Sequence, residues 1–176
     1  MYGNLEKAYK FAKQKHEGQI RRFSKKPYLT HLIRTYKIVN HYTQDEVMLV
    51  AALLHDVVED TKVKITNIHE IFGEEIAEIV WQVTSIKDKR PKKIALKEKV
   101  LKMSSKSKIV KLADRTANVI GLFNPKVNKK FISRYIAETE YVFGGVIIDD
   151  NDFKEIQTML WEKLFKIIKI LKIKFN

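Results

Sequence analysis

A helical repeat of apolar residues limits this chain to one class of fold. Apolar side chains recur at spacings of three and four along the chain, which places them on one face of an α-helix. Only three prolines and six glycines interrupt the repeat. No segment shows the sustained alternation of apolar and polar residues that is typical of a β-strand. The sequence therefore predicts an all-α protein, a helical bundle.

The apolar repeats divide the chain into a series of expected helices. The inner face of the first is expected to carry Leu5, Ala8, Tyr9 and Ala12. Thr43 is a suitable N-cap for the third, which continues to Asp60. The expected helices cover residues 4–16, 27–39, 44–60, 68–72 and 74–86, a segment opened by Pro91, and residues 108–123, 129–143 and 152–172. Because no linker or repeat separates two halves, we expect one domain over residues 1–176.

Composition and charge narrow the chemistry. With no cysteine, the chain forms neither disulfides nor thiolate metal sites, so imidazole and oxygen remain as metal ligands. The N-terminal residues lack the apolar core of a signal peptide, and no apolar run approaches a membrane span. We therefore expect a cytoplasmic protein. The net charge of +13 favours nucleic acid, a membrane surface or a phosphorylated small molecule as partner, or reflects only a lysine-rich composition.

One apolar helical run ends in four ionisable side chains. In LVAALLHDVVEDT, the apolar residues 49–54 lead directly into His55 and Asp56, and Glu59 and Asp60 follow one turn later. Residues four apart share a helix face, so His55 is expected beside Glu59 and Asp56 beside Asp60. Buried carboxylates are costly unless they are paired or bind a metal. An adjacent imidazole and carboxylate suit Mn²⁺, Fe²⁺ or Zn²⁺.

Two further polar residues lie in apolar helical segments elsewhere in the chain. Asp114 occurs in KLADRTANV with Lys111 and Asn118 on the same side, and His31 lies among the apolar residues of PYLTHL. Each has a structural alternative: a single histidine is often a hydrogen-bonded core residue, and Asp114 alone pairs with a nearby cation. Considered together, the set that suggests a mixed metal site is His31, His55, Asp56 and Asp114.

At these motifs the sequence resembles the hydrolase domain of the RelA/SpoT family, which belongs to the HD-domain phosphohydrolases. HEGQIRRFSKKPYLTHL is similar to the family's H-x-G-Q-x-R-K-S-G-x-P-Y-x-x-H-P segment, and AALLHDVVEDT to its A-x-L-L-H-D-x-x-E-D-T. FGEEIAEIVWQVT resembles a family helix that begins with F-G and ends with V-T, and KLADRTANV resembles K-L-A-D-R-x-x-N. Order and spacing agree over about residues 4–142.

The resemblance implies an HD-domain bundle with one Mn²⁺ per chain. The implied ligands are His31, His55, Asp56 and Asp114. The implied reaction is hydrolysis of guanosine tetra- or pentaphosphate, (p)ppGpp, to GDP or GTP plus pyrophosphate. Glu59 and Asp60 are then placed to orient the attacking water and accept its proton, with no choice made between them. The chain ends at Asn176 without a synthetase domain, so we expect a stand-alone small alarmone hydrolase, similar to the metazoan members.

Basic and polar side chains near these motifs are the expected substrate contacts. The set comprises Arg21, Arg22, Asn118, Lys92 and Tyr135. The two arginines are expected at the pyrophosphate or stacked on guanine, the asparagine at the sugar or a metal ligand, and the tyrosine at the ribose. The basic stretch 87–108 is expected to form a positive rim that attracts the substrate, with Lys92 as its best single candidate. The alternative for the two arginines is a solvated loop, and that for Tyr135 is core packing. The alternative for the basic stretch is a solvated face.

Some positions depart from the family pattern. Phe23 lengthens the basic loop by one residue, and Leu32 replaces the proline that usually follows the ligand histidine. Thr116 and Ala117 replace a common Leu-His pair, and Gly121 stands where many members have threonine. These departures bear on substrate preference more than on the metal site.

Two other functions stay open at this level. The same site suits another nucleotide, such as the 2′-phosphate of NADPH, which the animal members of the family imply. A non-catalytic module that binds RNA or an alarmone is the second, although the basic run lacks the interleaved aromatics of single-strand binders, so we do not expect a nucleic-acid partner. We interpret His16, His41 and His69 as structural and expect the last, amphipathic helix to pack on the bundle rather than on a membrane. The oligomeric state is left open.

Overall fold

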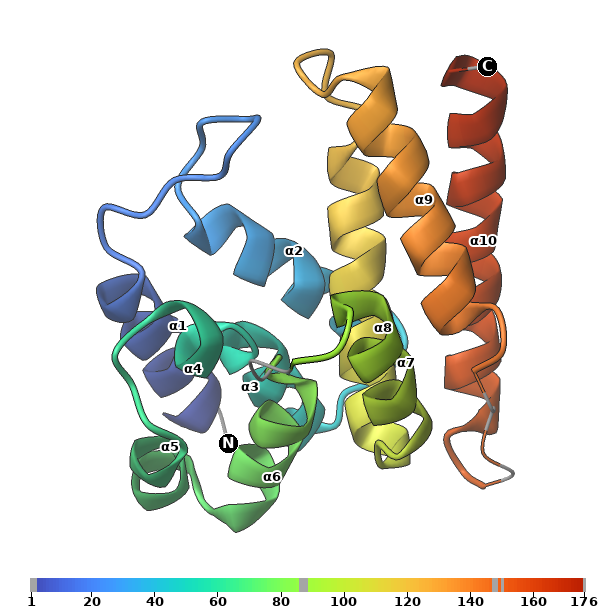
Figure 1. The fold of residues 1–176 in the computed structure, drawn as a ribbon. Helices are drawn as coiled ribbons and strands as arrows, with labels where there is room; N and C mark the ends of the chain where they lie inside the picture. The colour runs from blue at the N-terminus through green and yellow to red at the C-terminus, as the bar shows by residue number, and fades with distance from the viewer. Residues whose placement is uncertain (1–2, 86–88, 147–148, 150, 176) are drawn as a thin grey trace.

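The computed structural model describes residues 3–85, 89–146, 149 and 151–175 (Figure 1). Within these residues the chain forms helices joined by short loops, with no strand beyond one isolated bridge between Ile20 and Pro27. The helices are α1 (Gly3–Lys15), α2 (Leu29–Asn40), α3 (Glu46–Leu54), α4 (Val57–Asp60), α5 (Ile65–Phe72), α6 (Glu74–Val83), α7 (Lys92–Leu101), α8 (Ser105–Gly121), α9 (Lys129–Phe143) and α10 (Lys154–Phe175). The all-α prediction is confirmed.

Helix α8 occupies the centre of the bundle. It packs against α2, α3, α6 and α10, and Figure 1 shows it between the α1–α6 group on one side and α9 and α10 on the other. Most of its side chains are buried, including four charged ones, Lys108, Lys111, Asp114 and Arg115. A helix enclosed on several sides leaves little room for unpaired charge, so each of these side chains must find a partner.

Helix α10 lies along α8, which accounts for its apolar stripe. Leu160, Leu164, Ile168 and Leu171 are buried at spacings of three and four, the pattern of a helix that packs by one face. The prediction that this helix packs on the bundle is confirmed. None of the described helices combines the length and the apolar character that crossing a membrane requires.

Two local expectations are corrected. Thr43 is not the N-cap of α3: Asp45 is, since its carboxylate accepts a bond from the Met48 backbone N–H at 3.1 Å, while the Thr43 hydroxyl accepts one from the Asp45 N–H. Tyr9 does not belong to the inner face of α1, because it is 39% exposed. The close contact of α1 with α3 is made through the small side chains of Ala8 and Ala12, which leave the larger ring at the edge.

The helix expected to run to Asp60 is interrupted at His55 and Asp56. Helix α3 ends at Leu54 and α4 begins at Val57. Asp56 has φ −100° and ψ −5°, a conformation that turns the chain out of a regular helix. Adjacent side chains in a regular helix point about 100° apart. The turn brings His55 and Asp56 to the same side, with the His55 Nε2 3.1 Å from an Asp56 carboxylate oxygen.

Candidate metal centre and adjoining cavities

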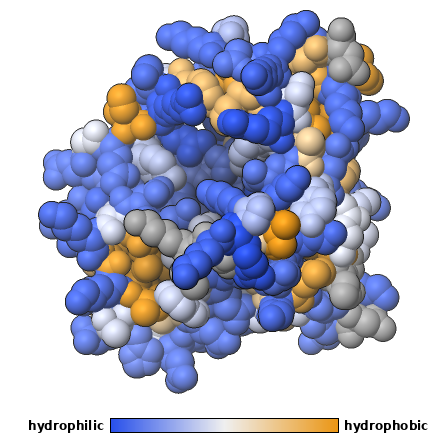
Figure 2. Space-filling model, in the orientation of Figure 1, coloured by the Kyte–Doolittle hydropathy of each residue, from blue (hydrophilic) through white to orange (hydrophobic). Residues whose placement is uncertain are grey.

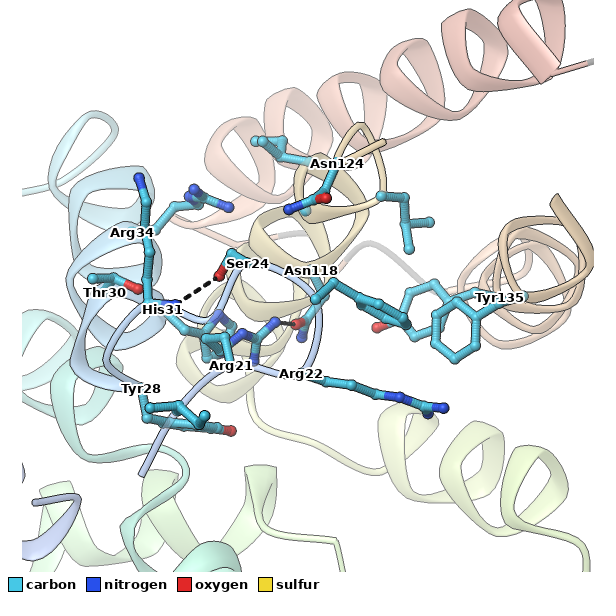
Figure 3. Close-up of a pocket in the computed structure, with 17 residues that line it drawn as sticks. Arg21, Arg22, Ser24, Tyr28, Thr30, His31, Arg34, Asn118, Asn124 and Tyr135 are labelled. Carbon is cyan, nitrogen blue, oxygen red and sulfur yellow. Dashed lines mark hydrogen bonds between the residues drawn. The ribbon is translucent and has the colours of Figure 1, made fainter. Parts of the chain in front are cut away.

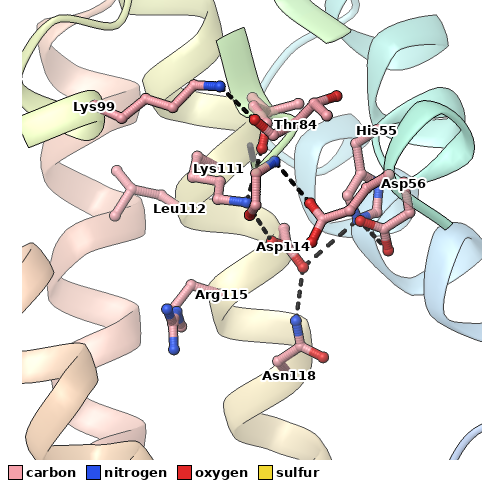
Figure 4. Close-up of polar contacts among 12 residues, drawn as sticks. His55, Asp56, Thr84, Lys99, Lys111, Leu112, Asp114, Arg115 and Asn118 are labelled. Carbon is pink, nitrogen blue, oxygen red and sulfur yellow. Dashed lines mark hydrogen bonds and ion pairs between the residues drawn. The ribbon is translucent and has the colours of Figure 1, made fainter. Parts of the chain in front are cut away.

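Four side chains from three parts of the chain converge at α8, and Figure 4 shows three of them, His55, Asp56 and Asp114. The His31 Nε2 lies 3.2 Å from the His55 Nε2 and 3.1 Å from the Asp114 Oδ1. Both imidazole Nε2 atoms also face the Asp56 Oδ2, at 3.4 Å from His31 and 3.1 Å from His55. His31, His55 and Asp56 satisfy the spacing of ligand atoms around one ion, and Asp114 contacts both histidines. The nitrogen and oxygen atoms of the four side chains therefore lie close enough together to form one site.

Neighbouring groups orient these four side chains. The His55 Nδ1 lies 2.9 Å from the Ala52 carbonyl oxygen, a bond that requires the proton on Nδ1 and leaves Nε2 free as a ligand. The Tyr28 hydroxyl donates to Asp56 Oδ2 at 2.7 Å. The Asn118 amide donates to Asp114 Oδ1 at 2.7 Å. Such outer bonds fix rotamers and are typical of metal centres.

Lys111 supports Asp114 from the other side. Its ammonium lies 3.3 Å from Asp114 Oδ2 and donates to the Val83 carbonyl oxygen at 3.0 Å. The lysine side chain is only 8% exposed. One oxygen of Asp114 therefore faces the lysine, while the other faces the two histidines, so that both are satisfied.

The electrostatic field of the cluster favours positive charge. Burial lowers the pKa of His55, but the Asp56 carboxylate and the bonds to Asp114 outweigh burial and raise the pKa to about 10. Burial raises the pKa of Asp56, yet His55 and His31 hold it well below the usual range. Burial also raises the pKa of Asp114, but Lys111 and the two histidines hold that pKa well below the usual range as well. Two ionised carboxylates that hold a proton on an imidazole provide a field suited to a divalent cation. The donor set of two imidazoles and two carboxylates, without thiolate, fits such an ion.

Glu59 and Asp60 lie next to this cluster but outside its ligand distances. Both are exposed on α4, and Glu59 is held in place because its carboxylate accepts a bond from the Ser85 backbone N–H at 2.7 Å. Burial raises the pKa of the Tyr28 phenol, and bonding with the Asp56 and Asp60 carboxylates raises it further. Tyr28 thus connects a candidate ligand with the carboxylate pair.

A cavity of about 560 Å³ opens beside His31 (Figure 3). It lies between the loop before α2 and helices α8 and α9, and Figure 2 shows a hollow bordered by hydrophilic residues on this face. The sequence candidates at its wall are Arg21, Arg22, Asn118 and Tyr135. The Arg21 guanidinium donates to the Asn118 Oδ1 at 2.7 Å, so a contact links the basic loop to the residue that supports Asp114.

Part of the cavity wall is aromatic. The Arg22 guanidinium carbon lies 5.2 Å from the Phe23 ring centroid and 5.7 Å from that of Phe131. Phe23 meets Phe131 edge-on at 5.1 Å, and Phe131 stacks with Tyr135 at 5.9 Å. The inserted Phe23 therefore anchors the loop to α9.

Lys92 lies in a different cleft. This second cleft, of about 1060 Å³, is lined by Glu59 and Asp60 as well as by basic residues of α7. Lys108 does not belong to the positive rim expected over residues 87–108, because it is buried and paired with Asp149 at 2.7 Å. Lys87 lies outside the described residues. Lys99 bonds to the carbonyl oxygens of Trp81 and Thr84 at the end of α6, because the last carbonyls of a helix need donors.

The structure places two further residues near the site, Tyr28 and His16. Tyr28, three residues before His31, was not singled out, although the i,i+3 spacing placed it on the same side. His16 is buried and stacks on the Tyr28 ring at 4.9 Å, with its Nδ1 2.8 Å from Gln19 Oε1. Gln19 in turn donates to the Asp60 carbonyl oxygen at 2.9 Å. His16 is therefore in contact with a tyrosine that orients Asp56, one of the candidate metal ligands.

Comparison with known proteins gives the chain a family. A model of the HD domain matches residues 8–143. A probable guanosine-3′,5′-bis(diphosphate) 3′-pyrophosphohydrolase of Mycoplasma genitalium is 32% identical over 94% of this chain. The bifunctional (p)ppGpp synthase/hydrolase SpoT of Escherichia coli is 38% identical over 72% of the chain. The chain spans about a quarter or less of the length of these two relatives, 24% and 19%.

Shorter animal proteins match over a larger share of their own length. A guanosine-3′,5′-bis(diphosphate) 3′-pyrophosphohydrolase of Drosophila melanogaster is 37% identical over 62% of this chain and 64% of the fly protein. A solved structure described as a metazoan ortholog of SpoT that hydrolyzes ppGpp superposes with a TM-score of 0.82 at 28% identity. That match covers 95% of this chain and 94% of the other.

Proposed function

This chain belongs to the HD-domain family, and on that basis we propose that it hydrolyses (p)ppGpp to GDP or GTP and pyrophosphate. One observation carries the proposal: His31, His55, Asp56 and Asp114 converge, and His31 among them lines a basic, nucleotide-sized cavity. A purely structural cluster of this kind would have no need of an open cavity at one of its histidines. The names of the similar proteins point to the same substrate.

The four converging side chains are the ligands for one Mn²⁺ per chain. Nitrogen and oxygen donors without thiolate suit Mn²⁺, Fe²⁺ or Zn²⁺, and we choose Mn²⁺ from the family resemblance. When bound, such an ion acidifies a coordinated water and neutralises charge on the phosphate. Tyr28, Asn118 and Lys111 hold the ligand carboxylates in place.

Glu59 and Asp60 serve as the proton acceptors. They are the exposed carboxylates beside the cluster, and Glu59 is fixed by the Ser85 N–H. In the reaction, a water oxygen attacks the phosphorus bound to the ribose O3′, the bond from that phosphorus to O3′ breaks, and O3′ leaves with a proton as the 3′-hydroxyl of GDP. The proton that the water loses passes to the carboxylate pair, and the pair or solvent returns one proton to the leaving O3′, so that the step is balanced.

The adjoining cavity holds the nucleoside. Arg21 is directed to Asn118 and lies 5.4 Å from the Tyr28 ring centroid, within reach of a phosphate or sugar next to the cluster. Arg22, Phe131 and Tyr135 offer flat surfaces to a base or ribose. Lys92 faces the second cleft, where the released pyrophosphate leaves on the side of Glu59. A nucleotide substrate and the cysteine-free composition support the cytoplasmic location that we propose.

The test combines turnover with metal content. The purified protein with Mn²⁺ should release pyrophosphate from ppGpp, and Asp56→Ala should lose both turnover and bound metal. Asp152→Ala, which removes an exposed aspartate before α10, is the matched control and should behave as the unaltered protein. Turnover of NADPH with none of ppGpp or pppGpp would show that the substrate is wrong. Full ppGpp turnover by Asp56→Ala would remove the metal site from the mechanism.

A further inference from the structure

Arg34 is a cation without an acidic partner at the wall of the cavity. It lies one helical turn after His31 on α2, and its side chain is exposed. Its guanidinium makes one long bond, from Nη1 to the Ala117 carbonyl oxygen at 3.4 Å. None of the carboxylates in the described part of the chain comes within 4.0 Å of it. An arginine has five N–H donors in a fork that matches phosphate, so most of the capacity of Arg34 is available to a ligand.

The cavity around Arg34 differs in charge from the second cleft. Among the described residues at its wall the cationic side chains are Arg21, Arg22, Lys26 and Arg34, and there is no carboxylate. The second cleft instead carries Glu59, Asp60 and Glu98 beside its basic residues. Cations gathered in a concave wall without counter-charges raise the local concentration of anions. The cavity therefore favours a ligand that carries further negative charge, in addition to the phosphates that meet the candidate metal ligands.

The position of Arg34 fixes which part of a nucleotide it can reach. His31 and Arg34 are three residues apart on α2, about 4.5 Å along the helix axis. In Figure 3, Arg34 lies at the same end of the cavity as Asn124, away from Tyr28 and Arg22. If the 3′-substituent of a ribose is at the four candidate metal ligands, its 5′-carbon projects away from them, because O3′ and C5′ are trans substituents of the adjacent carbons C3′ and C4′. The end at Arg34 is where 5′-phosphates then lie.

We propose that Arg34 is a specificity-determining residue that binds the 5′-di- or triphosphate of the substrate, with Asn124 at the same end of the cavity. The proposal rests on the proposed function, since it places the 3′-pyrophosphate at the metal cluster. It adds that the chain discriminates among guanosine nucleotides by the charge of the 5′-end, and that a residue of α2 contributes to this discrimination.

Kinetic comparison of two substrates tests the proposal. The substrates are ppGpp and guanosine 3′-diphosphate, which has a 5′-hydroxyl. Arg34→Ala should raise the KM for ppGpp roughly tenfold or more, the usual size of a lost charge-assisted bond, and should leave the KM for guanosine 3′-diphosphate unchanged. Lys37→Ala is the matched control, because it removes a positive charge one turn further along α2 at an exposed position outside the cavity. It should change neither constant.

Binding of a product separates this proposal from the proposed function. GDP keeps the 5′-diphosphate and is not hydrolysed, so calorimetry on the Mn²⁺-loaded protein measures the subsite without turnover. The unaltered protein should bind GDP more tightly than guanosine, and Arg34→Ala should reduce that difference at least tenfold. Equal affinity for GDP and guanosine, or an equal KM increase for both substrates in Arg34→Ala, would overturn the subsite. Failure to turn over ppGpp with the GDP preference intact would overturn the activity and leave Arg34 as an anion-binding residue.

Discussion

Asp114 shows how much a single side chain must satisfy in this protein. Its two oxygens meet His31, His55, Lys111 and Asn118 within 2.7–3.5 Å. Each contact comes from a residue that itself has a second partner, such as the Val83 carbonyl for Lys111. A carboxylate so surrounded is ionised, since neighbouring cations and bonds hold its pKa well below the usual range against the effect of burial.

Tyr28→Phe is the sharpest test at this scale. The substitution removes the hydroxyl that donates to Asp56 at 2.7 Å and keeps the ring that stacks on His16. Loss of an outer bond to a metal ligand should weaken metal affinity by roughly tenfold, which a competition titration with a chelating dye would measure. Tyr36→Phe, whose hydroxyl makes only a 3.4 Å bond to Asn40, is the control. Unaltered affinity in Tyr28→Phe would mean that Asp56 is oriented by its backbone alone.

The sequence was more informative about the candidate ligands, which the structure brings together, than about the residues that orient them. His55, Asp56 and Asp114 stood out because polar residues interrupt apolar helices, a signal visible in one dimension. Tyr28 gave no such signal, because a tyrosine beside a loop is common and its partner is 28 positions away. The hydrogen bond from the Ser85 N–H to the Glu59 carboxylate could not be predicted either, because it depends on where the end of α6 lies relative to α4.

At the scale of elements, the chain was easiest to predict where the apolar repeat is regular. Helix α9 spans Lys129–Phe143, the range expected from the sequence, because its apolar positions and its Asn128 cap agree. The region from Thr43 to Asp60 was harder. Two capping residues compete at its start, and the turn at Asp56 follows from a tertiary requirement, the convergence of two adjacent side chains, which local propensity does not contain.

The corner between α5 and α6 depends on Gly73. Its φ of 90° with ψ 170° is a conformation that L side chains rarely adopt. Gly73→Ala should therefore lower the free energy of unfolding by about 1–3 kcal/mol, as measured by urea denaturation. Gly121→Ala is the matched control: that residue is helical, and an added Cβ would meet no atom within 4 Å. It should be neutral or stabilising by up to about 1 kcal/mol. Equal losses in both variants would contradict the role assigned to the Gly73 backbone.

At the scale of the whole molecule, α10 is joined to the central helix by polar contacts as well as by its apolar stripe. Asp149, in the segment before α10, accepts a bond from Lys108 of α8 at 2.7 Å and one from the Ser105 hydroxyl at 2.9 Å. Burial raises the pKa of Asp149, but these bonds outweigh it and lower the pKa below the ordinary value of 3.8. The ionised carboxylate therefore stabilises the fold above that value, and the contribution is lost as the pH falls through the lowered pKa.

Asp149→Asn should accordingly lower stability in a pH-dependent way. At pH 7 the loss should be about 1 kcal/mol, modest because the Asp149 side chain is 28% exposed and solvent screens the pair. The difference from the unaltered protein should shrink below pH 4 and vanish once Asp149 is protonated. Thermal melts across this pH range measure it. A difference that stays constant with pH would assign the effect to shape rather than to charge.

The enclosure of α8 has a consequence for how such chains can change in length. A single inserted residue rotates everything after it by about 100°, so an insertion before Asp114 would swing that carboxylate away from both histidines and unseat the contacts with α2, α3, α6 and α10 together. The loop from Ile20 to Pro27 is closed by its own bridge, and the resemblance to the family motif predicts one extra residue there, Phe23. Additions and deletions should accumulate in loops of that kind, while the residue count of α8 stays constant among functional descendants.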